Sequence, residues 1–312
     1  MLKRTVRNNS RKSKKKEIYE IIKKLSKGYK IKTILKISKM AKSSYYKWKS
    51  KEEQIEKKKQ KELEEVKAIK ELYIEHKGRY GVDRMTNALK SDKKMKCNHK
   101  KVYRLMVENG YLSVVKRKKK YKKVGKPHPK HNVLKRNFTT SCPYDKIATD
   151  VTEISMFGQK LYISPIKDLH TNMIESNEIG RHATLEMAIK MIEKIKNKSI
   201  AEGTIIHSDQ GALYNSLKYQ KILEDNNFIQ SMSRKGTPID NSPMESFFST
   251  LKSEVIYNPL IKIENFEDLI KQIEEYIEYY NNKRIQKGLG YLTPREYKEK
   301  ELARISMENV EN

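Results

Sequence analysis

Apolar residues recur along this chain with two different periods, and the change of period separates a helical front part from a mixed back part. Before residue 125 the spacing is helical throughout. It predicts helices near residues 17–25, 31–37, 41–48, 50–75 and 100–109, the last one stopping at Gly110. The first three short helices predict a helix-turn-helix whose third helix is the candidate to enter a DNA groove, although an ordinary three-helix pack fits the same pattern.

The back part alternates strands with helices. Strands are predicted at 146–154, 160–169, 173–179, 204–209 and 228–233. Helices are predicted at 183–196, 213–226, 242–256 and 265–283. The order β-β-β-α-β-α-β-α is that of an α/β ribonuclease-H-like fold, a mixed five-stranded sheet with flanking helices. The fold class is therefore a ribonuclease-H-like core preceded by all-α helix-turn-helix-type domains.

Changes of composition set the expected domain boundaries. A Lys- and Arg-rich arm comes first, and a second basic stretch with Pro127 and Pro129 has the composition of a linker. The expected parts are a basic arm (1–16), a helix-turn-helix-like segment (17–55), a second helical DNA-binding domain (56–121), a basic linker (122–144), a catalytic core with a C-terminal helix (145–300) and a tail (301–312).

Charge is distributed very unevenly between the two parts. The formal net charge is +29, and residues 1–140 carry 46 Lys and Arg against 13 Asp and Glu. Residues 141–312 carry 22 against 26. A polyanion-binding front part joined to a near-neutral back part points to nucleic acid, because Lys and Arg that neutralise phosphates release condensed counterions.

Two cysteines, Cys97 and Cys142, exclude a disulfide framework, and no second ligand pair gives Cys97 the spacing of a zinc site. No apolar run is long enough to span a membrane, and the basic first residues lack the apolar segment of a signal peptide. We therefore expect a soluble cytoplasmic protein that associates with the nucleoid and has no membrane partner.

Three acidic residues of the back part stand where a metal site is expected. Asp150 lies within the first predicted strand, Asp209 at the carboxyl end of the fourth, and Glu245 on the first turn of the next helix. The two strands are neighbours in a ribonuclease-H-like sheet, so their carboxylates emerge together and must share a proton or bind a cation. Hard oxygen ligands without cysteine suit Mg²⁺ or Mn²⁺. Two such ions would serve in-line displacement at a phosphodiester.

Each acid taken alone also fits an ordinary structural role. Asp209 fits a turn or a helix N-cap, Glu245 fits a capping box with Pro243 at the first helical position, and Asp150 fits a hydrogen bond to a neighbouring loop. The fold order and the spacing of all three favour the metal site. Asp150, Asp209 and Glu245 are therefore predicted as catalytic residues and metal ligands.

The motifs around these acids resemble those of a known family, the insertion-element transposases of the IS-three type, and specifically their OrfB product with an integrase core of the retroviral-integrase-like superfamily. The resemblance covers almost the whole chain. Its motifs are ATDVTEI, HSDQGALYNS, SRKGTPIDNSPMESFFSTLKSE and YYNNKRIQKGLGYLTPREY in the back part. In the front part they are ISKMAKSSYYKW, GRYGVDRMTNAL and KKVYRLMVENGYLSVVKRKKKY.

The resemblance implies a DNA transposase that binds terminal inverted repeats, cleaves 3′ ends with Mg²⁺ and joins them to target DNA. It implies that the three acids are the metal ligands. The expected partners are double-stranded DNA and further copies of the chain, and the resemblance allows a protein from an upstream reading frame. Two alternatives are a catalytically silent DNA-binding repressor and a nuclease without joining activity.

Residues outside the triad are predicted to contact DNA or support the site. Lys252 lies two helical turns after Glu245 on the same face, where it could neutralise a phosphate or simply face solvent. Asn241 is expected to steady the start of the helix that carries Glu245. The predicted DNA contacts of the front part are Tyr45, Tyr46 and Lys47 of the third short helix and the basic run Lys116, Arg117, Lys118, Lys119 and Lys120.

Overall fold

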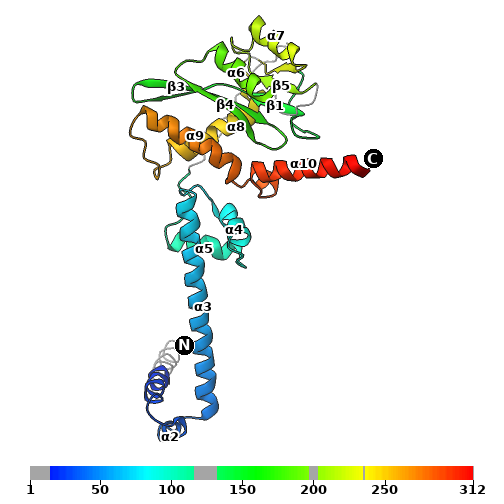
Figure 1. Ribbon diagram of the computed structural model, residues 1–312. Coiled ribbons are helices and arrows are strands. Elements are labelled where there is room, and N and C mark those ends of the chain that lie inside the picture. The colour runs from blue at the N-terminus through cyan, green and yellow to red at the C-terminus, as the bar shows by residue number, and fades with distance from the viewer. Residues whose placement is uncertain (1–14, 116–131, 197–202, 235, 312) are drawn as a thin grey trace, which may run out of the picture. The chain divides into compact units, whose positions relative to one another are not determined.

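The computed structural model describes residues 15–115, 132–196, 203–234 and 236–311 (Figure 1). The chain forms two compact units, Met1–Ile69 and Lys70–Asn312. The predicted DNA contacts Lys116–Lys120 lie outside the described residues.

The first unit is helical and has its own small core. It holds a helix over residues 15–25, helix α2 (Ile31–Ile37) and most of helix α3 (Lys42–Glu75). The core consists of Tyr19, Ile22, Ile34, Leu35 and Tyr45. The ring of Trp48 stacks on that of Tyr19 with 4.8 Å between centroids. The first two predicted short helices are confirmed.

Helix α3 differs from the prediction in its length. The sequence suggested one short helix near residue 45 and a separate helix over 50–75, whereas the structure has one continuous helix of 34 residues. No Gly or Pro occurs between residues 42 and 75, so nothing in the chain interrupts the backbone hydrogen bonds. The charged residues in the middle of α3 indicate that this part of the helix is exposed to solvent, and they do not end the helix.

Helices α4 (Val82–Ser91) and α5 (His99–Glu108) open the second unit. Their apolar faces are buried, with Met85 and Leu89 on α4 and Leu105 and Met106 on α5. The side chain of Asn98 caps α5 by accepting from the amide of Lys100. Gly110, at φ +72°, follows the helix in the left-handed conformation, as predicted.

A mixed sheet forms the centre of the second unit. Its strands are β1 (Lys146–Thr149), β2 (Thr152–Met156), β3 (Gln159–Asp168), β4 (Ile174–Gly180), β5 (Ile205–Ser208) and β6 (Ile229–Met232). Strand β3 pairs antiparallel with β4 on one side and with β1 and β2, end to end, on the other. The pairs β1–β5 and β5–β6 are parallel. The predicted ribonuclease-H-like sheet is therefore present, with its first strand divided in two at Asp150 and Val151.

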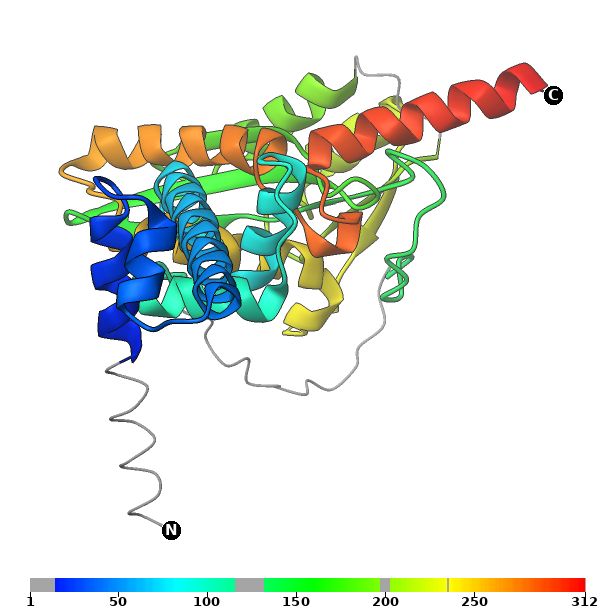
Figure 2. The ribbon, with the colours of Figure 1, turned by 90° about the horizontal axis from the view of Figure 1, so that it is seen from below.

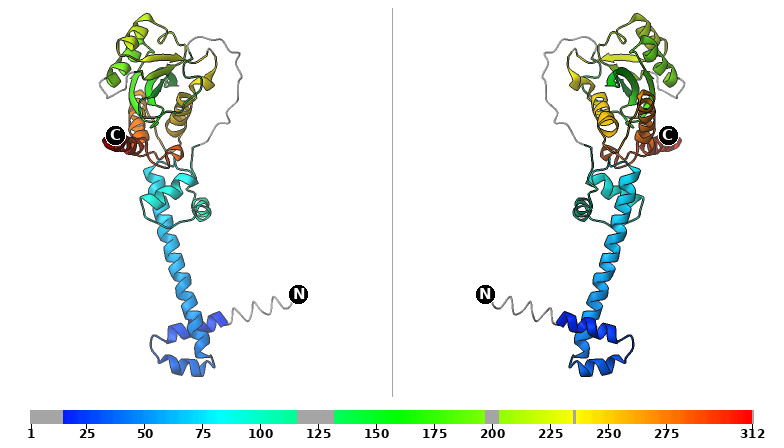
Figure 3. Two further views of the ribbon diagram at one scale, coloured as in Figure 1. Left: turned by 90° about the vertical axis from the view of Figure 1, so that its right-hand side faces the viewer. Right: turned by 90° about the vertical axis from the view of Figure 1, so that its left-hand side faces the viewer.

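Helices cover both faces of the sheet (Figures 1 and 3). One face packs on α8 (Ser242–Leu251) and α9 (Phe266–Asn282), through Phe247, Leu251, Ile273 and their neighbours. The opposite face packs on α6 (Leu185–Lys196) and α7 (Leu217–Asp225). Helix α8 continues as the π-helical turn η2 (Lys252–Ile256). These apolar contacts fix the position of α8 against the strands that carry the two aspartates.

The C-terminal helix α10 (Pro294–Glu311) extends away from the sheet (Figure 2). Its first turns are anchored by Lys298, which donates to Tyr144 and forms an ion pair with Glu175 at 2.7 Å. Farther along, Leu302 and Met307 are exposed. In the part of the chain that the structure describes, no helix is long and apolar enough to cross a membrane.

Candidate active site

Asp150 and Asp209 lie side by side at one edge of the sheet. Strands β1 and β5 run parallel, with Ala148 opposite His207. Continuing that register by two residues places Asp150, where the first strand breaks, opposite Asp209, the first residue after β5. Adjacent strands lie about 4.8 Å apart, so the two carboxylates share one small region.

One oxygen of each aspartate is held by the local backbone. The amide of Val151 donates to Oδ1 of Asp150 at 2.8 Å, and the amide of Gly211 donates to Oδ1 of Asp209 at 2.9 Å. Gly211 has a steric reason to be glycine, because a Cβ built there would lie 2.9 Å from the same Asp209 oxygen. The sequence analysis missed Gly211. The turn sequence that follows Asp209 was its only signal.

The local electrostatics favour a cation or a proton between these acids. Burial raises the pKa of Asp150 to about 7, and the negative charges of Asp209 and Glu245 act in the same direction. A carboxyl group with a raised pKa holds a proton more readily than usual, and a positive charge beside it would reverse that shift. The charges of Asp209 and Glu245 therefore both act on Asp150.

Glu245 lies on the first turn of α8, where it is exposed to solvent. Asn241 stands immediately before α8 and makes no side-chain cap to that helix. Instead, its amide Nδ2 donates to the carbonyl oxygen of Thr149 at 3.2 Å, across to the end of β1. Asn241 is buried, and its Oδ1 has no hydrogen-bond partner among the described residues. The residue thus connects the Glu245 helix to the strand that leads into Asp150.

A buried aspartate fixes the loop before α8. The carboxylate of Asp240 accepts from Arg234 at 2.7 and 2.8 Å and from Arg136 at 2.6 Å. These guanidinium groups, Arg234 first, hold the pKa of Asp240 well below its usual range. The sequence analysis did not identify this cluster, because Arg136 and Asp240 are about a hundred residues apart and no local pattern links them.

The acids do not form a closed ligand cage. Within the described ranges, no three His, Cys, Asp or Glu side chains are grouped closely enough to hold a metal ion. Asp150 and Asp209 are brought together by the register of their strands, whereas Glu245 approaches them from a separate helix. Lys252, at the end of α8, donates to the carbonyl oxygen of Glu153 on β2 at 3.0 Å. Lys252 therefore connects the helix that carries Glu245 to strand β2.

The structure corrects the prediction for one residue of the front part. Tyr45 is only 3% exposed and packs in the core of the first unit, so its side chain cannot reach a DNA groove. Tyr46 and Lys47 are exposed on the same helix. His207 is fully buried on β5, with Nδ1 2.9 Å from the hydroxyl of Ser231.

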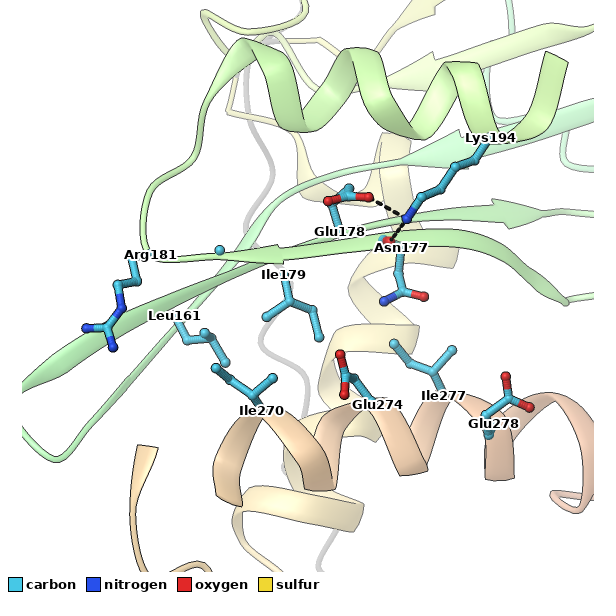
Figure 4. Close-up of a pocket in the computed structure, with 11 residues that line it drawn as sticks. Leu161, Asn177, Glu178, Ile179, Arg181, Lys194, Ile270, Glu274, Ile277 and Glu278 are labelled. Atoms are coloured by element: carbon cyan, nitrogen blue, oxygen red, sulfur yellow. Dashed lines mark hydrogen bonds and ion pairs between the residues drawn. The ribbon is translucent and has the colours of Figure 1, made fainter. Parts of the chain in front are cut away.

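A cavity of about 520 Å³ lies elsewhere in the second unit, between β4, α6 and α9. Figure 4 shows Lys194 of α6 directed at Glu178 and Asn177 of β4, with Ile270 and Ile277 of α9 below them. None of the predicted site residues lines this cavity. The candidate active site lies instead at the sheet edge where Asp150 and Asp209 meet.

Three family models match successive parts of the chain. Residues 59–119 match the family described as "HTH-like domain". Residues 140–238 and 245–302 match two families, each described as "Integrase core domain". The second and third matches together contain the sheet, its flanking helices and the three acids.

Similar proteins include two bacterial relatives. The "Putative transposase InsK for insertion sequence element IS150" of Escherichia coli (strain K12) is 43% identical over 239 residues, 74% of this chain and 82% of that protein. An "Uncharacterized transposase-like protein" of Haemophilus influenzae is 42% identical over 209 residues, 67% and 96% of the two chains. Among solved structures, the HTLV-2 integrase catalytic core domain in complex with magnesium matches 49% of this chain and 94% of its own, with 14% identity and a TM-score of 0.37.

Proposed function

We propose a function for this chain on the premise that it belongs to the family of insertion-element transposases with an HTH-like domain and an integrase core. The chain binds the terminal inverted repeats of its own element, cleaves the 3′ ends and joins them to target DNA. The observation that carries the proposal is the placement of Asp150 opposite Asp209 at the edge of the sheet. Glu245 is close enough to raise the pKa of Asp150.

Divalent cations fit the residues present at this edge. Asp150 and Asp209 already lie side by side at this edge. Glu245 would join them around Mg²⁺ or Mn²⁺, because each of the three offers hard carboxylate oxygens and no cysteine competes for the ion. The missing Cβ of Gly211 leaves the space that the Asp209 carboxylate occupies. When two such ions are bound, they supply the charge that activates an attacking oxygen and stabilises the leaving one.

The side chains around the acids hold them in place. The backbone amides of Val151 and Gly211 fix one oxygen of each aspartate. Asn241 ties the start of α8 to β1. In cleavage, water attacks the phosphorus and the bond to the 3′ oxygen breaks, so the element strand keeps a free 3′-hydroxyl. In joining, that hydroxyl attacks a target phosphodiester and displaces a new 3′-hydroxyl.

DNA binding is assigned to the front part of the chain. The exposed Tyr46 and Lys47 of the first unit and the exposed Lys100 and Tyr103 of α5 offer charged and aromatic contacts. The basic run 116–120 belongs to the same proposal. The complex on DNA contains several copies of the chain, and the family resemblance also allows a protein from an upstream reading frame as a partner.

A cleavage assay tests the function. The protein is incubated with Mg²⁺ and a labelled duplex copied from the end of the element, with supercoiled plasmid as the target. The proposal predicts both a cut strand and a strand joined to the plasmid. Binding without cutting would identify a silent DNA-binding repressor, and cutting without joining would identify a nuclease. Either result would overturn the proposal.

A further inference from the structure

Glu254 is a charged residue buried where an apolar one would be expected. It lies in the π-helical turn η2 and is 2% exposed. Arg284 donates to its carboxylate at 2.9, 3.0 and 3.2 Å, and the hydroxyl of Tyr276 donates at 3.1 Å. Burial alone would raise the pKa of Glu254, but the charges of Arg284, Arg84 and Arg79 and the hydrogen bond from Arg284 together lower it. A buried charge is kept only where its partners are well placed.

Two further arginines reach Glu254 from the HTH-like domain. Arg84 on α4 places Nη1 3.6 Å from the carboxylate. Arg79, in the segment before α4, donates from Nε to the carbonyl oxygen of Glu254 at 3.1 Å. The guanidinium of Arg79 also lies over the ring of Tyr279 on α9, 4.4 Å from its centroid. The HTH-like domain therefore contacts both the side chain and the backbone of Glu254 in the integrase core.

The neighbouring contacts make this attachment rigid. Tyr80 is buried, and its hydroxyl donates to the carbonyl oxygen of Lys283 at 2.8 Å. The ring of His76 stacks on that of Tyr80 with 3.8 Å between centroids. Asn258, just after η2, donates to the carbonyl oxygen of Lys77 at 3.0 Å. The segment 76–84 thus docks on the end of the α8–η2 helix and on α9.

Glu254 and Glu245 belong to one uninterrupted helical stretch. Helix α8 ends at Leu251 and η2 begins at Lys252, with no turn between them. The amide of Tyr257 bonds to the carbonyl of Lys252, five residues earlier, which confirms the wider π-helical turn. Such turns are rare and persist where other contacts hold them. A shift of Glu254 would therefore be passed along the helix to Glu245.

We infer that Arg84 and Glu254 are positioning residues that couple DNA binding by the HTH-like domain to the placement of Glu245 in the active site. The inference rests on the proposed function. Helix α5, which packs on α4, presents the exposed Lys100, Tyr103 and Arg104 on its outer face. DNA bound to that face of α5 restricts the movement of α4. Arg84 on α4 then restricts Glu254, and through it the helix that carries Glu245.

Hydrogen exchange without metal tests the coupling directly. Binding of the element-end duplex slows backbone exchange over residues 245–256 in the unaltered chain. Arg84→Met removes this effect, since methionine fills the space but cannot pair with Glu254, and Arg84→Lys restores part of it. Arg181→Met is the matched control, because Arg181 is an exposed arginine whose partners, Gln159, Glu267 and the ring of Phe266, all lie away from Glu254 and Arg84. Arg84 is the better target, since removing Glu254 would leave Arg284 buried and unpaired.

Cleavage kinetics give a second readout. Arg84→Met lowers kcat about tenfold while KM for the duplex stays within about threefold, because the loss lies in positioning and not in binding. Slowed exchange that persists in Arg84→Met, or an unchanged kcat, overturns the inference. An unaltered chain that shows the exchange effect but does not cut overturns only the proposed function. A chain that does not bind the duplex overturns both.

Discussion

The side-chain amide of Asn241 donates a hydrogen bond to the carbonyl oxygen of Thr149, and this bond joins the two elements that carry Asp150 and Glu245. Both residues are buried. Thr149 ends β1 immediately before Asp150, and Asn241 stands immediately before α8. The spacing between the first and third acids therefore depends on a short polar contact as well as on the apolar packing of α8.

Asn241→Ala is expected to impair both stability and cleavage. The carbonyl of Thr149 would lose a buried donor, which costs about 1–3 kcal/mol of unfolding free energy. The helix of Glu245 would also lose its tie to β1, so cleavage should slow by about tenfold or more. Urea unfolding and cleavage rates measure the two effects. Asn87→Ala is the control, because Asn87 bonds only within its own exposed helix turn. Equal cleavage by both variants would contradict the role of Asn241.

Gly211→Ala is expected to impair cleavage while leaving the fold intact. The new Cβ would lie 2.9 Å from Oδ1 of Asp209, so the carboxylate must move. A displaced ligand should slow cleavage on the order of 100-fold. Gly288→Ala is the matched control, because a Cβ there meets nothing within 4 Å. Melting temperatures of the two variants should agree, and a similar cleavage rate in both would show that the space beside Asp209 is not needed.

Stability is expected to depend on pH through His76. Burial lowers the pKa of His76 to about 4, whereas an unfolded histidine has a pKa of about 6.5. Below about pH 6.5, His76 therefore binds a proton in the unfolded chain but stays neutral in the folded chain. The free energy of unfolding consequently falls as the pH is lowered to about 4. The loss is on the order of 3 kcal/mol. Urea unfolding from pH 7 to pH 4 measures it.

His76→Gln is the comparison for that experiment. Glutamine does not titrate, so the unfolding free energy of this variant should change less between pH 7 and pH 4 than that of the unaltered chain. Identical pH dependence in the two proteins would rule out the buried neutral histidine. The docking of segment 76–84 on the integrase core would then need another account.

The sequence was sufficient for the sheet and for the two aspartates, because both depend on local patterns. Five strands were expected from apolar runs, and all are present, with the first one divided at Asp150. The parallel register of β1 and β5 follows from the fold order, so the pairing of Asp150 with Asp209 could be anticipated. The spacing of apolar residues likewise predicted α9, from Phe266 to Asn282.

The remaining features depend on contacts between distant parts of the chain. Glu254 lies in a segment that looks like an ordinary amphipathic helix, and its partners Arg84 and Arg284 are 170 and 30 residues away. Tyr45 was expected to contact DNA because it lies on the helix predicted to enter a DNA groove, but its side chain packs in the core of the first unit. A single sequence carries no signal for either pairing, since periodicity reports only which face of a helix is apolar.

The most direct test of the account replaces Asp150 with asparagine and measures cutting and binding on the same element-end duplex. Asp145→Asn is the matched control, because Asp145 precedes the same strand and its carboxylate accepts from Ser141 alone among the described residues. The account predicts that Asp150→Asn gives no cut product with Mg²⁺ while its Kd for the duplex stays within about threefold of the unaltered chain. Asp145→Asn should cut normally. Cutting by Asp150→Asn at the normal rate would contradict the assignment of the active site.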